Sequence, residues 1–160
     1  MKRYFFSVAF FVFLGTPGSI AAFDVTGTSA YQLNENTYLY TIEFEYGYLN
    51  AEAWLPIFPS RSEQVTTAPA LSYNLYSAGE QAVGEAQGIV LSDTKIKNNR
   101  YHIAKNKRET FTLVVVYESE SEIKPELHVT EFSHVIQKDG ETSIMQPSAS
   151  QLLEYRATIF

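Results

Sequence analysis

One stretch of the sequence, residues 38–48, limits the possible folds of this chain more than any other. Its even positions hold aromatic or aliphatic side chains throughout, namely Tyr38, Tyr40, Ile42, Phe44, Tyr46 and Tyr48. The odd positions between them include polar Thr41, Glu43 and Glu45. Because side chains alternate between the two faces of an extended strand, this period of two predicts a β-strand with one buried face.

A second stretch late in the chain, residues 111–117, repeats the pattern. Its large apolar side chains are Phe111, Leu113, Val115 and Tyr117, and smaller β-branched residues separate them. We expect the two strands to supply the facing halves of one core. Trp54, Phe44 and Val115 are expected to be largely buried in that core.

Shorter extended segments separated by turn signals fill most of the remaining chain. They are residues 23–33, 51–57, 71–75, 89–91, 101–103, 127–136 and 153–159, with a further strand through Ile144. Spacing of this kind predicts an antiparallel sandwich or barrel. Residues 51–57 are expected to return as the hairpin partner of residues 38–48, until Pro56 and Pro59 prevent further ladder hydrogen bonds.

Local signals specify several connections. Residues 34–36, Asn-Glu-Asn, predict a turn between the first two strands, and residues 139–140, Asp-Gly, suit the positive φ angles of a two-residue hairpin. The alternation of a later strand slips near Glu131, which predicts a β-bulge. Residues 77–88 are rich in Gly, Ala and Glu and predict an irregular excursion, and residues 148–152 could take one helical turn.

The first residues, 1–22, have the composition of a cleaved signal peptide. Two basic residues precede an apolar run at residues 4–14, and helix breakers and the small residues Ser19 and Ala21 follow it. The apolar run is shorter than the ~20 residues of a spanning helix. We therefore expect a mature chain without a transmembrane helix, folded as one domain over residues 23–160.

The amino-acid composition limits the cellular location and the kinds of binding partner that we expect for this protein. Removing Lys2 and Arg3 from the twelve basic residues leaves ten against eighteen acidic residues, a net charge of about −8. This charge argues against binding to nucleic acid or anionic lipid. The chain has no cysteine, which excludes disulfides, thiolate metal sites and a lipid-modified cysteine. We expect a bacterial protein that is secreted, periplasmic or extracellular.

No arrangement of residues specifies a catalytic chemistry. The sequence lacks a Gly-x-Ser-x-Gly elbow, a His-Glu-x-x-His pair and a phosphate-binding glycine loop. His128 and His134 are six residues apart, about 20 Å along a strand and too far for one metal ion. Only the fold could bring His102 to either of them. We therefore expect no catalytic site, no metal site and no cofactor.

Charged residues form two groups on either side of residues 111–117. The basic group comprises Lys95, Lys97, Arg100, Lys105, Lys107 and Arg108. The acidic group comprises Glu118, Glu120, Glu122 and Glu126. Because the strand between them spans about 23 Å, we expect two opposite poles. We hypothesise that the basic pole binds another envelope protein, an anionic surface polymer or a second copy, and calcium is an alternative for the acidic group.

The sequence predicts a signal peptide followed by about eight or nine short strands, with a late Phe-x-Leu-x-Val-x-Tyr strand at residues 111–117. This arrangement resembles the immunoglobulin-like β-sandwiches of uncharacterised bacterial secreted proteins. The resemblance spans the mature chain and implies an all-β fold, a single antiparallel sandwich and export. Such sandwiches host many functions. The expected function is a noncatalytic binding or structural module of the cell envelope or surface.

Two alternatives remain open. The first is a small exported enzyme whose site is assembled from scattered residues, which a pocket with clustered carboxylates or a perturbed histidine would favour. The second is a small outer-membrane barrel, because residues 38–48 could face lipid and the chain ends in Phe160. The many aromatic residues could also build a sugar-stacking face.

Overall fold

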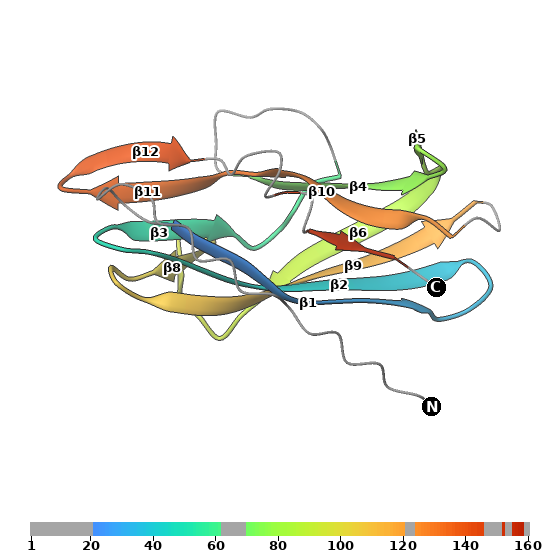
Figure 1. The fold of residues 1–160 in the computed structure, drawn as a ribbon, viewed down its shortest axis with the longest axis horizontal. Helices are drawn as coiled ribbons and strands as arrows, with labels where there is room; N and C mark the ends of the chain where they lie inside the picture. Colours follow the sequence, from blue (N-terminus) through green and yellow to red (C-terminus); the bar gives the residue numbers. More distant parts are fainter. Residues whose placement is uncertain (1–20, 62–69, 121–123, 146–151, 153–154, 159–160) are drawn as a thin grey trace.

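The computed structural model describes residues 21–61, 70–120, 124–145, 152 and 155–158. These residues form thirteen β-strands in three antiparallel sheets (Figure 1), so the prediction of an all-β, antiparallel fold is confirmed. Each sheet is open, with an edge strand on either side, and the described strands do not form one closed sheet. Within these ranges no helix has the length and hydrophobicity needed to cross a membrane. The signal segment up to residue 20, and all of the helical turn expected at residues 148–152 except Leu152, lie outside the described residues.

The first sheet contains both of the long predicted strands. Across the sheet its strands are β1 (Ala21–Gln32), β2 (Thr37–Tyr48), β9 (Arg108–Ser119) and β6 (Gly84–Leu91). β2 and β9 are direct neighbours, with Phe44 opposite Phe111. They form one wall of the core, and the expectation that they face each other is wrong. Alternation specifies which face of a strand is buried, but it does not specify which strand lies beside it.

A second sheet covers the buried face of the first (Figure 1). Its strands are β13 (Arg156–Ala157), β10 (Glu126–Phe132), β4 (Leu71–Ser77) and β5 (Glu80–Gln81). The ring of Phe44 lies edge to face against Phe132, with centroids 5.5 Å apart, and 5.7 Å from the ring of Tyr155. Phe44 and Val115 are fully buried, as predicted. Aromatic side chains from the two sheets thus form the centre of one core.

The third sheet lies beside these two layers (Figure 1). Its strands are β12 (Glu141–Met145), β11 (His134–Lys138), β3 (Glu52–Pro56), β8 (Arg100–Ile103) and β7 (Ile96–Lys97). β3 pairs with β8 and β11, so the predicted hairpin between residues 51–57 and β2 is wrong. Trp54 is half-buried, and not largely buried as predicted, because its neighbours Ala53 and Leu55 take the core face.

Both turns predicted from the sequence are confirmed. Between β1 and β2, the side-chain oxygen of Asn34 accepts hydrogen bonds from the N–H groups of Asn36 at 3.0 Å and Thr37 at 2.8 Å. Between β11 and β12, Asp139 and Gly140 have φ angles of 52° and 86°. These angles suit the twist of a two-residue hairpin, which explains why Asp-Gly occurs here.

The predicted bulge in β10 is also confirmed. The register between β10 and β4 shifts between Val129 and Glu131, where the alternation in the sequence slips. Past the bulge the chain leaves the second sheet at Ser133 and continues as β11 in the third sheet. The N–H of Ser133 donates to the carbonyl oxygen of Ala70 at 2.8 Å. The predicted strand at residues 127–136 is therefore two strands in two sheets.

Residues 77–88 are not the predicted irregular excursion. They form β5 and the first half of β6, joined to β4 by a turn at Ala78 and Gly79. Within β6, a Cβ at Gly88 would lie 2.8 Å from side-chain atoms of both Tyr73 and Pro59. Glycine allows this close approach between the layers. Gly88, one of the glycines that predicted an irregular segment, instead allows β6 to pack closely against Tyr73 of β4.

The structure has more strands than the eight or nine that the sequence predicts. The additional strands include β5 and β7, each of two residues. Segments this short carry no alternation of their own and form only because a longer strand lies beside them. β13 lies within the strand predicted at residues 153–159, of which the structure describes residues 155–158. The described residues thus form two facing layers and a third sheet that share one hydrophobic core.

Candidate functional site

A hollow of about 480 Å³ lies on the outer side of the second sheet. We call it the Glu126 hollow. It is lined by Tyr76, Ser77, Ala78, Gly79, Lys124, Glu126, His128 and Thr158. Acidic, basic, aromatic and hydroxyl side chains therefore meet at one place on the surface, on segments that are far apart in the sequence.

Alternation along β10 determines which side chains lie at the centre of the Glu126 hollow. Leu127 and Val129 of β10 are buried in the core, so Glu126 and His128 point to the opposite face. Tyr76 of β4 lies directly across from Glu126 in the sheet. On the other side of β10, Ala157 of β13 pairs with Leu127, which brings the following residue, Thr158, alongside Glu126.

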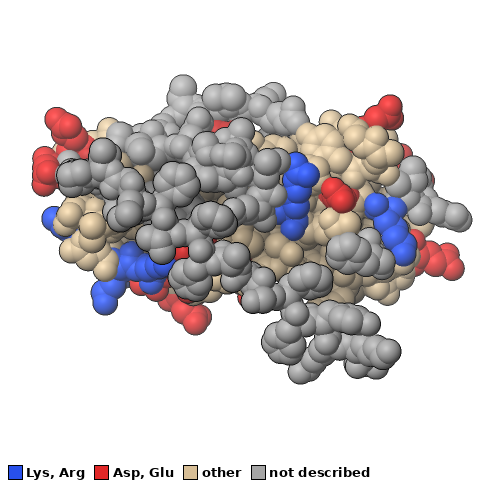
Figure 2. Space-filling model, in the orientation of Figure 1, with Lys and Arg blue, Asp and Glu red and all other residues tan. Residues whose placement is uncertain are grey.

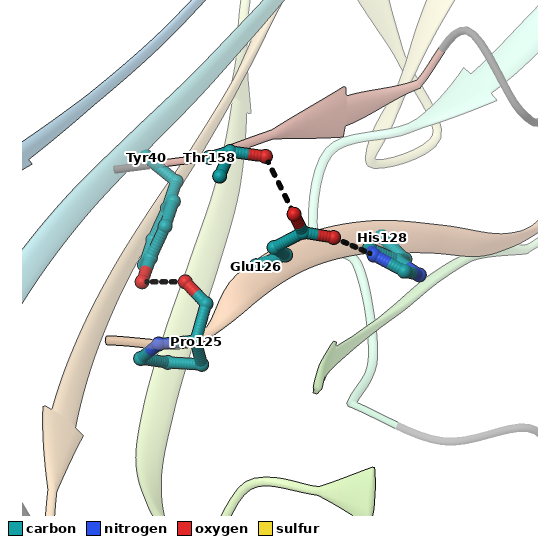
Figure 3. Close-up of polar contacts among 5 residues, drawn as sticks. All are labelled: Tyr40, Pro125, Glu126, His128 and Thr158. Atoms are coloured by element: carbon teal, nitrogen blue, oxygen red, sulfur yellow. Dashed lines mark hydrogen bonds and ion pairs between the residues drawn. The ribbon is translucent and has the colours of Figure 1, made fainter. Parts of the chain in front are cut away.

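The carboxylate of Glu126 is held from both sides (Figure 3). Its Oε2 atom lies 2.9 Å from Nε2 of His128, and the hydroxyl of Thr158 donates to Oε1 at 3.1 Å. The hydrogen bond from His128 is the largest cause of a lowered pKa for Glu126; partial burial opposes it, and the Thr158 hydrogen bond and the charges of His128 and Arg156 add to it. The Glu126 carboxylate is ionised at neutral pH.

The backbone at Glu126 is anchored through the preceding residue, Pro125. The phenol of Tyr40, a core residue of β2, donates to the carbonyl oxygen of Pro125 at 2.6 Å (Figure 3). This hydrogen bond links the start of β10 to the first sheet. Glu126 is thus presented by a segment anchored in the core, although its own side chain is 43% exposed.

The same combination of residues occurs a second time in the molecule. On the third sheet, Nε2 of His102 lies 3.0 Å from Oε2 of Glu52, and the His102 ring lies 5.1 Å from Trp54. In the Glu126 hollow the corresponding aromatic residue is Tyr76, with its ring 5.0 Å from that of His128. Since a Glu–His–aromatic cluster occurs at both places, the hydrogen bond from the hydroxyl of Thr158 distinguishes the Glu126 cluster.

The order of groups in the Glu126 hollow favours hydrogen bonding over nucleophilic catalysis. In a Ser-His-Asp arrangement the imidazole lies between the hydroxyl and the carboxylate and accepts the hydroxyl proton. Here the carboxylate lies in the middle, and the Thr158 hydroxyl donates to it and not to His128. Across the parts of the chain that the structure describes, no three His, Asp or Glu side chains gather as a metal ion would require.

Most of the basic residues predicted from the sequence lie at two turns, one at either end of β8. Lys97 and Arg100 flank the Asn98-Asn99 turn of the β7–β8 hairpin, with Lys95 just before it, and Lys105 and Lys107 lie in the turn before β9. Arg108, the last of the group, forms ion pairs with Asp24 and, at 2.9 Å, with Glu45.

The predicted acidic residues are divided between two sheets. Glu118 is close to the end of β9 and Glu120 follows it, so both lie at the opposite end of that strand from Arg108. Glu126 belongs to the hollow on the second sheet, and Glu122 lies outside the described residues. Figure 2 shows red and blue side chains near one another at both ends of the face that it draws. Both ends of this face therefore carry both signs of charge.

No protein-family model, curated protein or solved structure matches this chain.

Proposed function

We propose that this chain is an exported, noncatalytic binding module of the cell envelope, and that its ligand binds in the Glu126 hollow. The signal-like segment at residues 1–22 supports export. The fold in this proposal is an immunoglobulin-like β-sandwich, which two antiparallel layers facing across an aromatic core support.

The observation that carries the proposal is the position of the Glu126 carboxylate between His128 and Thr158. The lowered pKa of Glu126 keeps the group charged, which suits an acceptor of hydrogen bonds from a ligand. A general acid or base works best with a pKa near the working pH, and the shift of Glu126 is in the opposite direction. The geometry thus supports recognition in preference to proton transfer.

The side chains around the Glu126 hollow suit a polyhydroxylated ligand. The carboxylate oxygens accept hydrogen bonds from ligand hydroxyls, and the ammonium group of Lys124 donates to ring and hydroxyl oxygens. Tyr76 adds an aromatic side chain to the wall. An envelope glycan combines these features, and a neutral one avoids repulsion by Glu126.

Calorimetric titration of the purified protein tests this proposal, with chitotetraose as a neutral probe and tetragalacturonate as an anionic probe. We expect chitotetraose to bind, and Glu126→Gln to weaken binding about tenfold because a charge-assisted hydrogen bond is lost. Glu52→Gln is the matched control, because it changes the second Glu–His pair. Failure of both sugars to bind, or equal losses in the two variants, would contradict the assignment of the hollow.

The same titration separates the hollow from the basic group. If tetragalacturonate alone binds and the triple change of Lys105, Lys107 and Arg108 to Ser abolishes binding, the ligand site lies at the turn before β9. Attachment to an anionic polymer would then replace the Glu126 hollow as the proposed function. Chitotetraose binding that is unchanged in the triple variant supports the hollow.

A further inference from the structure

The outer face of the first sheet has a regular arrangement of rows. Odd-numbered side chains of β2 and even-numbered side chains of β9 point away from the core, because their neighbours along each strand are buried. The pairing registers align these side chains across all four strands. One row contains Tyr31, Leu39, Val116 and Gln87, and the next contains Ser29, Thr41, Val114 and Ile89.

Five of the eight side chains in these two central rows are apolar or aromatic, and they form a largely apolar band that is open to solvent, with Gln87, Ser29 and Thr41 as its polar members. Tyr31 is 58% exposed, Val116 41% and Ile89 36%. Leu91, at the end of β6 in the following row, is 48% exposed. Single exposed apolar residues are common on protein surfaces, but a contiguous set on one flat sheet is typical of an interaction site.

Acidic residues border the band on both sides along the strands. Glu85 and Glu118 lie opposite each other in the row beyond Val116, and Glu43 lies in the row beyond Thr41. Arg108, the one cation within the four strands of this sheet, is at its far end and is already paired with Asp24 and Glu45. Arg61, outside the sheet, donates to the carbonyl oxygen of Gly84 and lies over the core-facing ring of Tyr117. This face therefore has an apolar band with an acidic border. We call it the acidic sheet face.

We propose that the acidic sheet face binds a protein segment that presents apolar side chains flanked by Lys or Arg. Burial of Val116 and Ile89 would supply the apolar contact, and the glutamates at the border would pair with the flanking cations. The net charge of the whole chain, −6, also favours approach of a basic partner. Two copies meeting through this face would instead oppose carboxylates to carboxylates.

This surface is separate from the Glu126 hollow. Glu126 lies on the outer side of the second sheet, whereas the acidic sheet face lies on the outer side of the first, with the core between them. The module would therefore have two contact surfaces on opposite layers. The inference does not depend on the identity of the ligand in the hollow.

The experiment is an NMR titration of the isotope-labelled protein with a capped heptapeptide of alternating Lys and Leu. A peptide of alternating Glu and Leu is the control for charge. We expect the basic peptide to shift backbone amide signals of β6 and β9, and the acidic peptide to shift none. The affinity should fall steeply with salt, because charges at the border are exposed and screened.

Matched variants locate the contact. The double change Ile89→Thr and Val116→Thr keeps β-branched side chains and should weaken peptide binding about tenfold. Ile96→Thr makes the same chemical change at a residue that is 55% exposed on the third sheet, and it should leave the affinity unchanged. Glu118→Gln should weaken binding, whereas Glu80→Gln, on the second sheet, should not.

Three results would overturn the inference. The first is a peptide affinity that the Ile89 and Val116 changes leave intact, since the basic peptide would then bind only through general charge. The second is equal binding of the acidic peptide. The third is concentration-dependent sedimentation of the unliganded protein that the double variant abolishes, because the face would then be an interface between copies.

Discussion

His128 and Glu126 point to the same face of β10, with Nε2 of the imidazole 2.9 Å from Oε2 of the carboxylate. Alternation along the strand makes this pairing possible, and the buried residues on either side of His128 hold the backbone that presents it. The pair occupies the centre of the Glu126 hollow, so the ionisation of Glu126 affects both the stability of the fold and the proposed ligand site.

The pKa of Glu126 should depend on His128. In the folded protein the carboxyl should titrate below the ~4.3 of an unfolded chain, and His128→Gln should move its midpoint upward, because the largest cause of the shift is removed. Carbon-detected NMR of the side-chain carboxyl measures both midpoints. His102→Gln, which changes the second Glu–His pair, is the control, because it should leave the titration of Glu126 unchanged.

This shift has a defined effect on stability. Because the folded-state pKa is lowered, Glu126 stabilises the fold at pH values above its unfolded pKa, and this contribution disappears as the pH falls through the folded pKa. The wild type and the His128→Gln variant should therefore differ less in their free energy of unfolding, measured in urea, at pH 2.5 than at pH 5. A difference that grows on acidification would contradict this linkage.

Tyr40→Phe should destabilise the protein by about 1 to 3 kcal/mol, because the buried carbonyl oxygen of Pro125 would lose its hydrogen bond from the phenol. Tyr31→Phe removes the same hydroxyl from an exposed residue and should have almost no effect. Chemical denaturation measures both. Equal stability of the two variants would show that the tie between β2 and the start of β10 is absent.

Phe44→Ala should cost about 3 to 5 kcal/mol, the range for deleting a core aromatic side chain. Phe44 contacts rings from its own sheet and from the second sheet, so its loss leaves a cavity between the layers. Phe58→Ala, at a residue that is 71% exposed, should change stability by less than about 0.5 kcal/mol. A small effect at Phe44 would mean that the layers do not pack as described.

Gly88→Ala should destabilise the fold by about 1 to 3 kcal/mol through overpacking. The added methyl group would lie 2.8 Å from the Tyr73 ring and 2.8 Å from Pro59. Gly27→Ala is the control, because the nearest atom there, at 3.2 Å, is a carboxylate oxygen of Glu43 that can move. Thermal unfolding of the two variants compares them, and equal melting temperatures would argue against the close approach of β6 to β4.

Features set by neighbouring residues were predictable from the sequence. The buried face of β2, the Asn34 turn, the Asp139-Gly140 turn and the bulge near Glu131 each depend on a few adjacent positions, and all are present. Strand partners were not predictable in the same way. The pairing of β6 with β9, and of β3 with β8 and β11, depends on packing between segments that are far apart in the chain.

The candidate site was predictable only in part. Glu126 and His128 are separated by one residue in a strand pattern, so the sequence carried a signal that they share a face. The closeness of Glu126 in the sequence to Glu118, Glu120 and Glu122 instead suggested one acidic group after β9. The alternation at residues 153–159 predicts that Thr158 faces away from buried Ala157, but it does not predict that β13 pairs with β10. The partner of a strand depends on packing between distant segments, so the contact of Thr158 with Glu126 was not predictable.

The central claim is that the Glu126 hollow binds a ligand without transforming it. The most direct measurement is an NMR titration with chitotetraose in which protein and sugar signals are recorded in the same sample over a day. We predict that amide shifts cluster at Tyr76, Glu126 and His128 while the sugar signals stay intact. Shifts confined to other parts of the protein, or the appearance of cleaved sugar, would contradict the account.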